Sequence, residues 1–106
     1  MPTQFRRYEL LLPTNFNDGS MVPRRLLGQT LREIRKQFGS ISAETQHIEG
    51  YWERRGKLHR DLNVRLFVDV PDTAESRQFF VDFKERLKER FQQIDIWLTS
   101  YLVDVI

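Results

Sequence analysis

The sequence contains no cysteine, which excludes disulfide bonds, thiolate metal sites and cysteine nucleophiles. Its hydrophobic runs are short, and none approaches the ~20 apolar residues that a membrane-spanning helix needs. The run that follows the N-terminal arginines, residues 10–12, ends at Pro13 and is too short for a signal peptide. We therefore expect a protein without a leader or membrane span, located in the cytoplasm of a bacterial-type cell.

A large excess of charge of one sign is also lacking. The chain has 17 Lys and Arg against 15 Asp and Glu, a formal net charge of +2 in 106 residues. Such a mixed surface does not by itself indicate a nucleic-acid partner. The only histidines, His47 and His59, form neither an HxH nor an HExxH motif, and there is no glycine-rich phosphate loop. The sequence thus predicts no metal site and no cofactor, in a single domain over residues 1–106.

The stretch 62–70 gives the clearest strand signal. Its apolar residues recur every second position, as one face of a strand requires; they are Leu62, Val64, Leu66, Val68 and Val70. The alternate positions include Arg65, Phe67 and Asp69, which are a cation, an aromatic ring and a carboxylate. Pro71 ends the stretch. One face is therefore predicted to join the core, and the other to carry any function.

The remaining elements follow from periodicity and from start and stop signals. The helix over 72–93 is predicted to begin with a capping box of Asp72 and Glu75. Its buried stripe is predicted to consist of Phe80, Phe83, Leu87 and Phe91. Gly50 is expected to mark a bulge or a close backbone approach, and Arg55–Gly56 a hairpin turn. The other predicted segments are strands over 6–12, 41–54, 57–70 and 94–106 and a helix over 22–38.

The predicted order is β-α-β-β-α-β, an α+β arrangement with both helices on one face of a four-stranded antiparallel sheet. Its first and third strands lie in the centre. This pattern resembles the ferredoxin-like fold, including the superfamily of dimeric α+β barrels. Gly50-Tyr51-Trp52 before the hairpin is similar to uncharacterised small bacterial ferredoxin-like proteins, which bring no assigned activity. The resemblance implies a fold and, for the dimeric barrels, pairing of one sheet with another.

One face of the predicted sheet has no helix over it, and large aromatic residues lie there among charges of both signs. The second strand contributes His47, Glu49 and Tyr51 if its register holds as far as Gly50, and Trp52 joins them if it does not. Aromatic residues exposed at this density are typical of a surface that contacts another molecule. The other strands are expected to contribute Glu9, Leu11, Arg65, Phe67, Asp69, Asp95, Trp97, Thr99 and Tyr101.

The first of three functional hypotheses is self-association through this face or through a sheet edge, with a dimer as the expected assembly. A small-molecule ligand could be trapped between the subunits. Arg65 is expected to pair with Glu9, Asp69 or Asp95, because buried charges must be paired.

The second hypothesis is binding of RNA or single-stranded DNA through the first helix and a basic hairpin tip that contains Arg54, Arg55, Lys57 and Arg60. The only aromatic candidates for base stacking on the first and third strands are Tyr8 and Phe67, and Tyr8 is expected to face the helices. The third-strand signature of RNA recognition motifs is absent from residues 64–69, and Asp69 and Asp95 would repel phosphate.

The third hypothesis is an enzyme whose site lies in the cavity between subunits. An acid, a base and an anion anchor could come from His47, Glu49, Tyr51, Arg65, Asp69 and Asp95. The sequence spacing of these residues matches no known catalytic motif.

Overall fold

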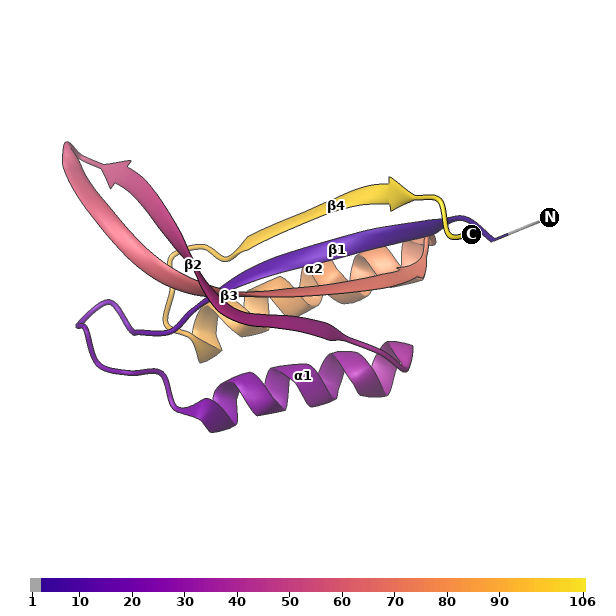
Figure 1. Ribbon diagram of the computed structural model, residues 1–106, viewed down its shortest axis with the longest axis horizontal. Coiled ribbons are helices and arrows are strands. Elements are labelled where there is room, and N and C mark those ends of the chain that lie inside the picture. The colour runs from indigo at the N-terminus through magenta and orange to yellow at the C-terminus, as the bar shows by residue number, and fades with distance from the viewer. Residues whose placement is uncertain (1–2) are drawn as a thin grey trace.

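The sheet has the strand order β2-β3-β1-β4, and all its pairs are antiparallel. The computed structural model describes residues 3–106, and both helices lie on the same side of the sheet (Figure 1). This arrangement confirms the predicted α+β, ferredoxin-like fold, with the first and third strands in the centre. The elements are β1 (Phe5–Pro13), α1 (Arg24–Phe38), β2 (Ser42–Arg54), β3 (Lys57–Pro71), α2 (Ala74–Arg90) and β4 (Trp97–Val103).

The core lies between the sheet and the two helices. The even-numbered side chains over residues 8–12 of β1 and 64–70 of β3 enter it, as the two-residue period predicted, and Leu66 and Val70 are fully buried. Tyr8 also faces the helices and stacks on Phe80 of α2, with ring centroids 4.1 Å apart. The predicted phenylalanine stripe of α2 is confirmed as core, since Phe83 is completely buried. Because these side chains bury one face of the sheet, the odd-numbered side chains of the same strands must lie on the opposite face.

The ends of the helices differ slightly from the prediction. Gly39 ends α1 as expected, in the left-handed conformation with φ +86°, and its N–H donates to the Arg35 carbonyl at 2.7 Å. The predicted capping box of Asp72 and Glu75 is wrong, because the N-cap of α2 is Thr73, whose hydroxyl accepts from the Ser76 N–H at 3.1 Å. Asp72 instead accepts from Arg6 Nε at 2.9 Å.

The last predicted strand is shorter than expected. Helix α2 ends at Arg90 and β4 begins at Trp97, so the connection between them includes Asp95 and Ile96. Ile96 is nonetheless buried, which explains why its apolar period extended the predicted strand toward the helix.

Strands β2 and β3 continue beyond the rest of the sheet as a bent hairpin, which we call the arm (residues 48–63; Figure 1). Its turn has positive φ at Arg55 (54°) and Gly56 (76°), and so confirms the predicted turn. The register shifts between Glu44 and Ile48, whereas the predicted bulge was at Gly50. Gly50 does mark a close approach, because a Cβ there would lie 3.1 Å from Asn63 Nδ2.

The arm makes the molecule elongated, with principal extents of 49 × 30 × 25 Å. Its radius of gyration is 14.7 Å, against about 13 Å for a compact domain of this length. No helix within residues 3–106 is long and apolar enough to cross a membrane.

Candidate functional site

The sheet surface opposite the helices, which we call the open face, is formed by the odd-numbered residues of β1 and β3 and their neighbours across the strands. Leu11 lies between Arg65 and Trp97, and Arg7 lies between Asp69 and Tyr101. The open face comprises Arg7, Glu9, Leu11, Glu44, Arg65, Phe67, Asp69, Trp97, Thr99 and Tyr101. Most of these positions were predicted; Arg7 and Glu44 are additions.

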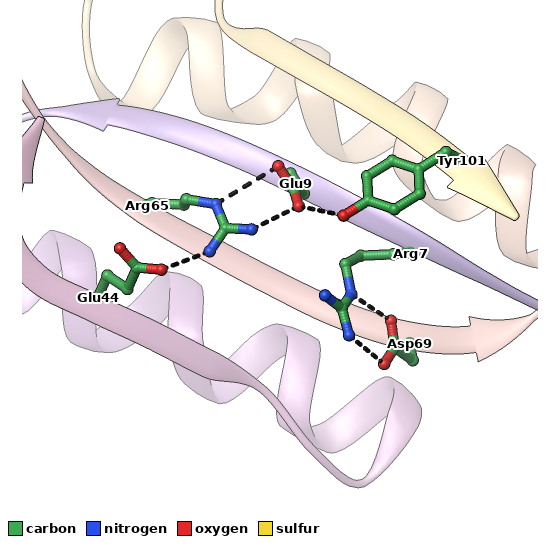
Figure 2. A network of polar contacts seen from close by, with 6 residues as sticks. All are labelled: Arg7, Glu9, Glu44, Arg65, Asp69 and Tyr101. Atoms are coloured by element: carbon green, nitrogen blue, oxygen red, sulfur yellow. Dashed lines mark hydrogen bonds and ion pairs between the residues drawn. The ribbon is translucent and has the colours of Figure 1, made fainter. Parts of the chain in front are cut away.

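Arg65 is the centre of one ion-pair network on the open face (Figure 2). Its guanidinium donates to Glu9 through Nη2 at 2.5 Å and Nε at 3.4 Å, and to Glu44 through Nη1 at 2.5 Å. The Tyr101 hydroxyl donates to the same Glu9 carboxylate at 2.8 Å. Of the three partners predicted for Arg65, the structure therefore selects Glu9, and adds Glu44 from β2.

A second ion pair on the open face joins Arg7 to Asp69. The guanidinium binds both carboxylate oxygens, at 2.8 and 3.0 Å, in a fork geometry that Lys could not reproduce (Figure 2). Phe67 lies between the two networks, with its ring centroid 4.9 Å from the Arg7 guanidinium carbon and 4.5 Å from that of Arg65. The open face is thus a layer of paired charges around one aromatic ring.

These contacts fix the charge states of the open face. Hydrogen bonds from Arg65 lower the pKa of Glu9, and hydrogen bonds from Arg7 lower the pKa of Asp69. The pKa values of both arginines are raised in return. All four groups are therefore fully charged at neutral pH, and neither carboxylate is tuned to exchange a proton there. The arrangement favours a surface prepared for burial over one that performs acid–base chemistry.

The expected positions of Glu49 and Tyr51 on the open face are wrong. They lie across from Leu62 and Arg60, which are on the helix side of β3. There they form a separate cluster, in which Glu49 accepts from Arg60 at 2.5 Å and from the Tyr51 hydroxyl at 2.9 Å. His47 falls within the register shift and is exposed. The alternative, in which Trp52 lies on the open-face side, agrees with its pairing to His59.

Asp95 is the other candidate that lies elsewhere. It precedes β4 and pairs with Lys84 of α2 at 3.0 Å, which lowers its pKa. The six residues of the enzyme hypothesis are thereby divided among the open face, the far side of the arm and a loop. Within residues 3–106, no three His, Asp or Glu side chains are grouped so that they could hold a metal ion.

The two basic surfaces of the nucleic-acid hypothesis also lie apart. The tip of the arm projects away from the body, while α1 lies below the sheet on the helix side (Figure 1). Arg60 is already paired with Glu49, which leaves Arg54, Arg55 and Lys57 at the tip. The aromatic rings named for base stacking are occupied, Tyr8 by Phe80 and Phe67 by two guanidinium groups.

A cleft of about 590 Å³ opens where the arm bends away from the sheet. Leu11 and Trp97 form one side of it, and Gly50, Trp52 and Asp61 of the arm form the other. Sequence reasoning missed this cleft and the role of Asp61 in it, because both depend on the bend of the hairpin. The alternation of side chains along β3 places Asp61 on the same face as Arg65. This alternation was the one feature of the sequence that could have indicated Asp61 as a residue of the open-face side.

Comparison with known proteins supports the fold. No family model matches the sequence, and no curated protein matches it. Among solved structures, a phage SAM lyase in complex with S-methyl-5'-thioadenosine is similar at a TM-score of 0.66, with 16% identity over 99% of this chain and 92% of that one.

Two CutA1 structures are similar to a comparable degree. The divalent cation tolerance protein CutA1 from Thermus thermophilus has a TM-score of 0.65 and 11% identity, over 95% of this chain and 85% of that one. CutA1 from Oryza sativa has a TM-score of 0.62 and 16% identity, over 97% and 83%. At these identities the likeness extends to the fold alone.

Proposed function

We propose that this chain is a subunit of a homo-oligomer, assembled through the arm and the open face, with a dimer as the simplest form. The arm is the observation that carries the proposal. A two-stranded hairpin is at best marginally stable alone in water, so an arm of this length needs a cover. Its own chain supplies little, because nearly every residue of β2 is exposed.

The apolar side chains of the arm support the same conclusion. Tyr51 and Leu58, on the side away from the open face, are 60% and 61% exposed, and Trp52 on the other side is 40% exposed. Exposed apolar groups at this density favour contact with a second protein surface. On the open face, Trp97 and Tyr101 are also exposed, and they lie on β4, an edge strand whose backbone groups are unpaired on one side.

The charges of the open face are compatible with burial in an assembly. An ion pair can be removed from water only when its hydrogen-bonding groups are satisfied, and Arg7–Asp69 and Arg65–Glu9 meet that condition within one subunit. We further propose that a small ligand lies between the subunits where the faces do not touch. The phage SAM lyase, which holds S-methyl-5'-thioadenosine, is a precedent for a ligand of nucleoside size on this fold.

Sedimentation equilibrium over a range of micromolar concentrations tests the assembly. We expect a mass above the 12.8 kDa of one chain, and Leu58→Ser in the arm should shift the equilibrium toward the monomer by at least about tenfold. Val81→Ser is the matched control, because Val81 is a comparably exposed apolar residue on α2. A wild-type protein that sediments as a 12.8 kDa monomer at tens of micromolar would overturn the proposal.

A second candidate, binding of single-stranded nucleic acid, is favoured by one face of α1. At about 100° per residue, its five exposed cations fall within about 120° of the helix circumference; they are Arg24, Arg25, Arg32, Arg35 and Lys36. None of them has an ion pair within the described part of the chain. Acidic residues are absent from this face, so it could track a phosphate backbone.

The two basic surfaces can be tested separately because they lie apart. Binding of an oligothymidylate would be measured at about 50 mM salt, where the phosphate contribution is strong. Arg25→Gln with Arg32→Gln should weaken binding if α1 is the site, while Arg54→Gln with Arg55→Gln serves as the matched change at the tip. An absence of binding by the wild-type protein at this salt concentration would end the hypothesis.

A further inference from the structure

The cleft at the root of the arm has the size and lining of a small-molecule site. Its volume of about 590 Å³ lies within the range of about 300–1,000 Å³ typical of such sites. Trp52 and Trp97, the only tryptophans in the chain, both line it. Leu11, Ile94 and other apolar groups complete its walls.

Trp52 is held in place by two contacts. Its ring stacks on His59, with centroids 4.2 Å apart and planes 11° from parallel. Its indole Nε1 donates to Asp61 Oδ2 at 2.5 Å. One face of the indole is thus covered by His59 and its polar edge is satisfied, so the ring is a rigid wall rather than a mobile side chain.

Asp61 is the unusual group of this cleft. It is half-buried, and no Lys, Arg or His pairs with it in the part of the chain that the structure describes, whereas Glu9, Glu44 and Asp69 on the same side of the sheet are all paired. The Trp52 indole donates to a single oxygen of this carboxylate, and no other side chain within residues 3–106 donates to it. A partly buried carboxylate without a cation is the exception among the acids on this side of the sheet.

The other charges that line the cleft do not satisfy Asp61. Asp95 is neutralised by Lys84 at 3.0 Å. Among the described residues, Arg54 is the only cation in the lining, and it belongs to the last residue pair before the hairpin turn, opposite Lys57. Asp61 is four residue pairs further from the turn, opposite Gly50. The unpaired negative charge therefore lies deeper along the arm than the positive one.

We propose that this cleft binds a small organic cation that carries an aromatic or apolar body. Indole rings attract cations through their π faces, and a nearby carboxylate adds a direct charge interaction. The apolar walls would contact the body of the ligand. A bare metal ion does not fit, because a single carboxylate among apolar walls lacks the several oxygen ligands that hard cations require. The site lies within one subunit and does not rest on the proposed assembly.

Tryptophan fluorescence is a direct assay, because both tryptophans of the chain line the cleft. Benzyltrimethylammonium is the probe, with benzyl alcohol as a neutral aromatic and benzenesulfonate as an anionic one. We expect a saturable change with the cation, and binding at least about tenfold weaker for either of the others. No saturation by about 10 mM cation, or equal binding of the neutral compound, would overturn the proposal.

Asp61→Asn tests the role of the carboxylate, because the amide oxygen can still accept from Trp52 while the charge is lost. We expect affinity for the cation to fall about tenfold, with an unchanged thermal midpoint as evidence of intact folding. Glu53→Gln is the matched control: Glu53 is exposed on the same arm, has no ion pair within residues 3–106 and does not line the cleft. An equal loss in both variants, or preferential binding of benzenesulfonate, would overturn the assignment.

Discussion

The variant Phe67→Ala tests whether Phe67 lies at an interface between subunits or in the core of one subunit. Phe67 is half-buried, lies opposite Glu9 on the open face, and contacts two guanidinium groups at 4.5 and 4.9 Å. Partial burial of a phenylalanine contributes about 1 kcal/mol, and each exposed cation–π contact about 0.5–1 kcal/mol. We therefore expect Phe67→Ala to reduce the free energy of unfolding of the monomer by about 2–3 kcal/mol.

Phe83→Ala provides the reference for a core position. Phe83 is completely buried between α2 and the sheet, and its truncation should cost about 3–5 kcal/mol through lost burial and a cavity. Urea unfolding would be followed at two protein concentrations, because association of the folded state raises the apparent stability with concentration. That dependence should diminish in Phe67→Ala. It should persist in any Phe83→Ala protein that still folds.

Two results would refute this reasoning. If Phe67→Ala costs the monomer as much as Phe83→Ala, Phe67 belongs to the core and the strand register is displaced by one residue. If Phe67→Ala leaves the mass by sedimentation equal to that of an oligomeric wild type, the open face is not the interface, and the assembly proceeds through the arm or the edges alone.

Two further predictions concern the folded chain itself. Arg65 and Arg7 lower the pKa of Glu9 and Asp69 below the unfolded values of about 4. These pairs therefore stabilise the fold above about pH 4, and their contribution is lost as the pH falls through the folded-state pKa values. The urea midpoint of unfolding should fall between pH 7 and pH 3, and less steeply in Asp69→Asn than in the wild type. An equally steep fall in that variant would contradict the assignment. Thr73→Ala should reduce the free energy of unfolding by about 1 kcal/mol, because the α2 N-cap is lost. Asp72→Ala removes only a surface ion pair worth about 0–1 kcal/mol. A larger loss for Asp72→Ala than for Thr73→Ala in urea unfolding would support the predicted capping box instead.

The fold could be predicted from the sequence because its central elements have strong periodic signals. Alternation at 62–70 placed β3 in the centre of the sheet, and the phenylalanine spacing placed the buried face of α2. The exact helix start was ambiguous: Asp72 and Thr73 are adjacent, and either side chain could cap. The extended backbone at Thr73 and its hydrogen bond from the Ser76 N–H distinguish them.

The candidate site was only partly predictable, for a reason that lies in β2. Residues 42–47 are mostly polar and show no apolar alternation, so nothing local records the register shift between Glu44 and Ile48. That shift depends on pairing with β3, which is remote in sequence. Glu49 and Tyr51 were consequently placed on the wrong face, and the cleft beside Asp61 could not be foreseen. Where both faces of a strand had clear partners, as in β1, the open-face residues were correct.

The position of β1 between β3 and β4 has a consequence for biosynthesis. Arg7 lies across from Asp69 on one side and Tyr101 on the other, so β1 is an edge strand until β4 has been made. At about 5–20 residues per second, translation from the end of β1 at Pro13 to the end of β4 at Val103 takes about 5–18 s. Throughout that interval the centre of the future sheet exposes unpaired backbone groups. Nascent chains that stall before β4 should therefore be prone to aggregation and to capture by chaperones.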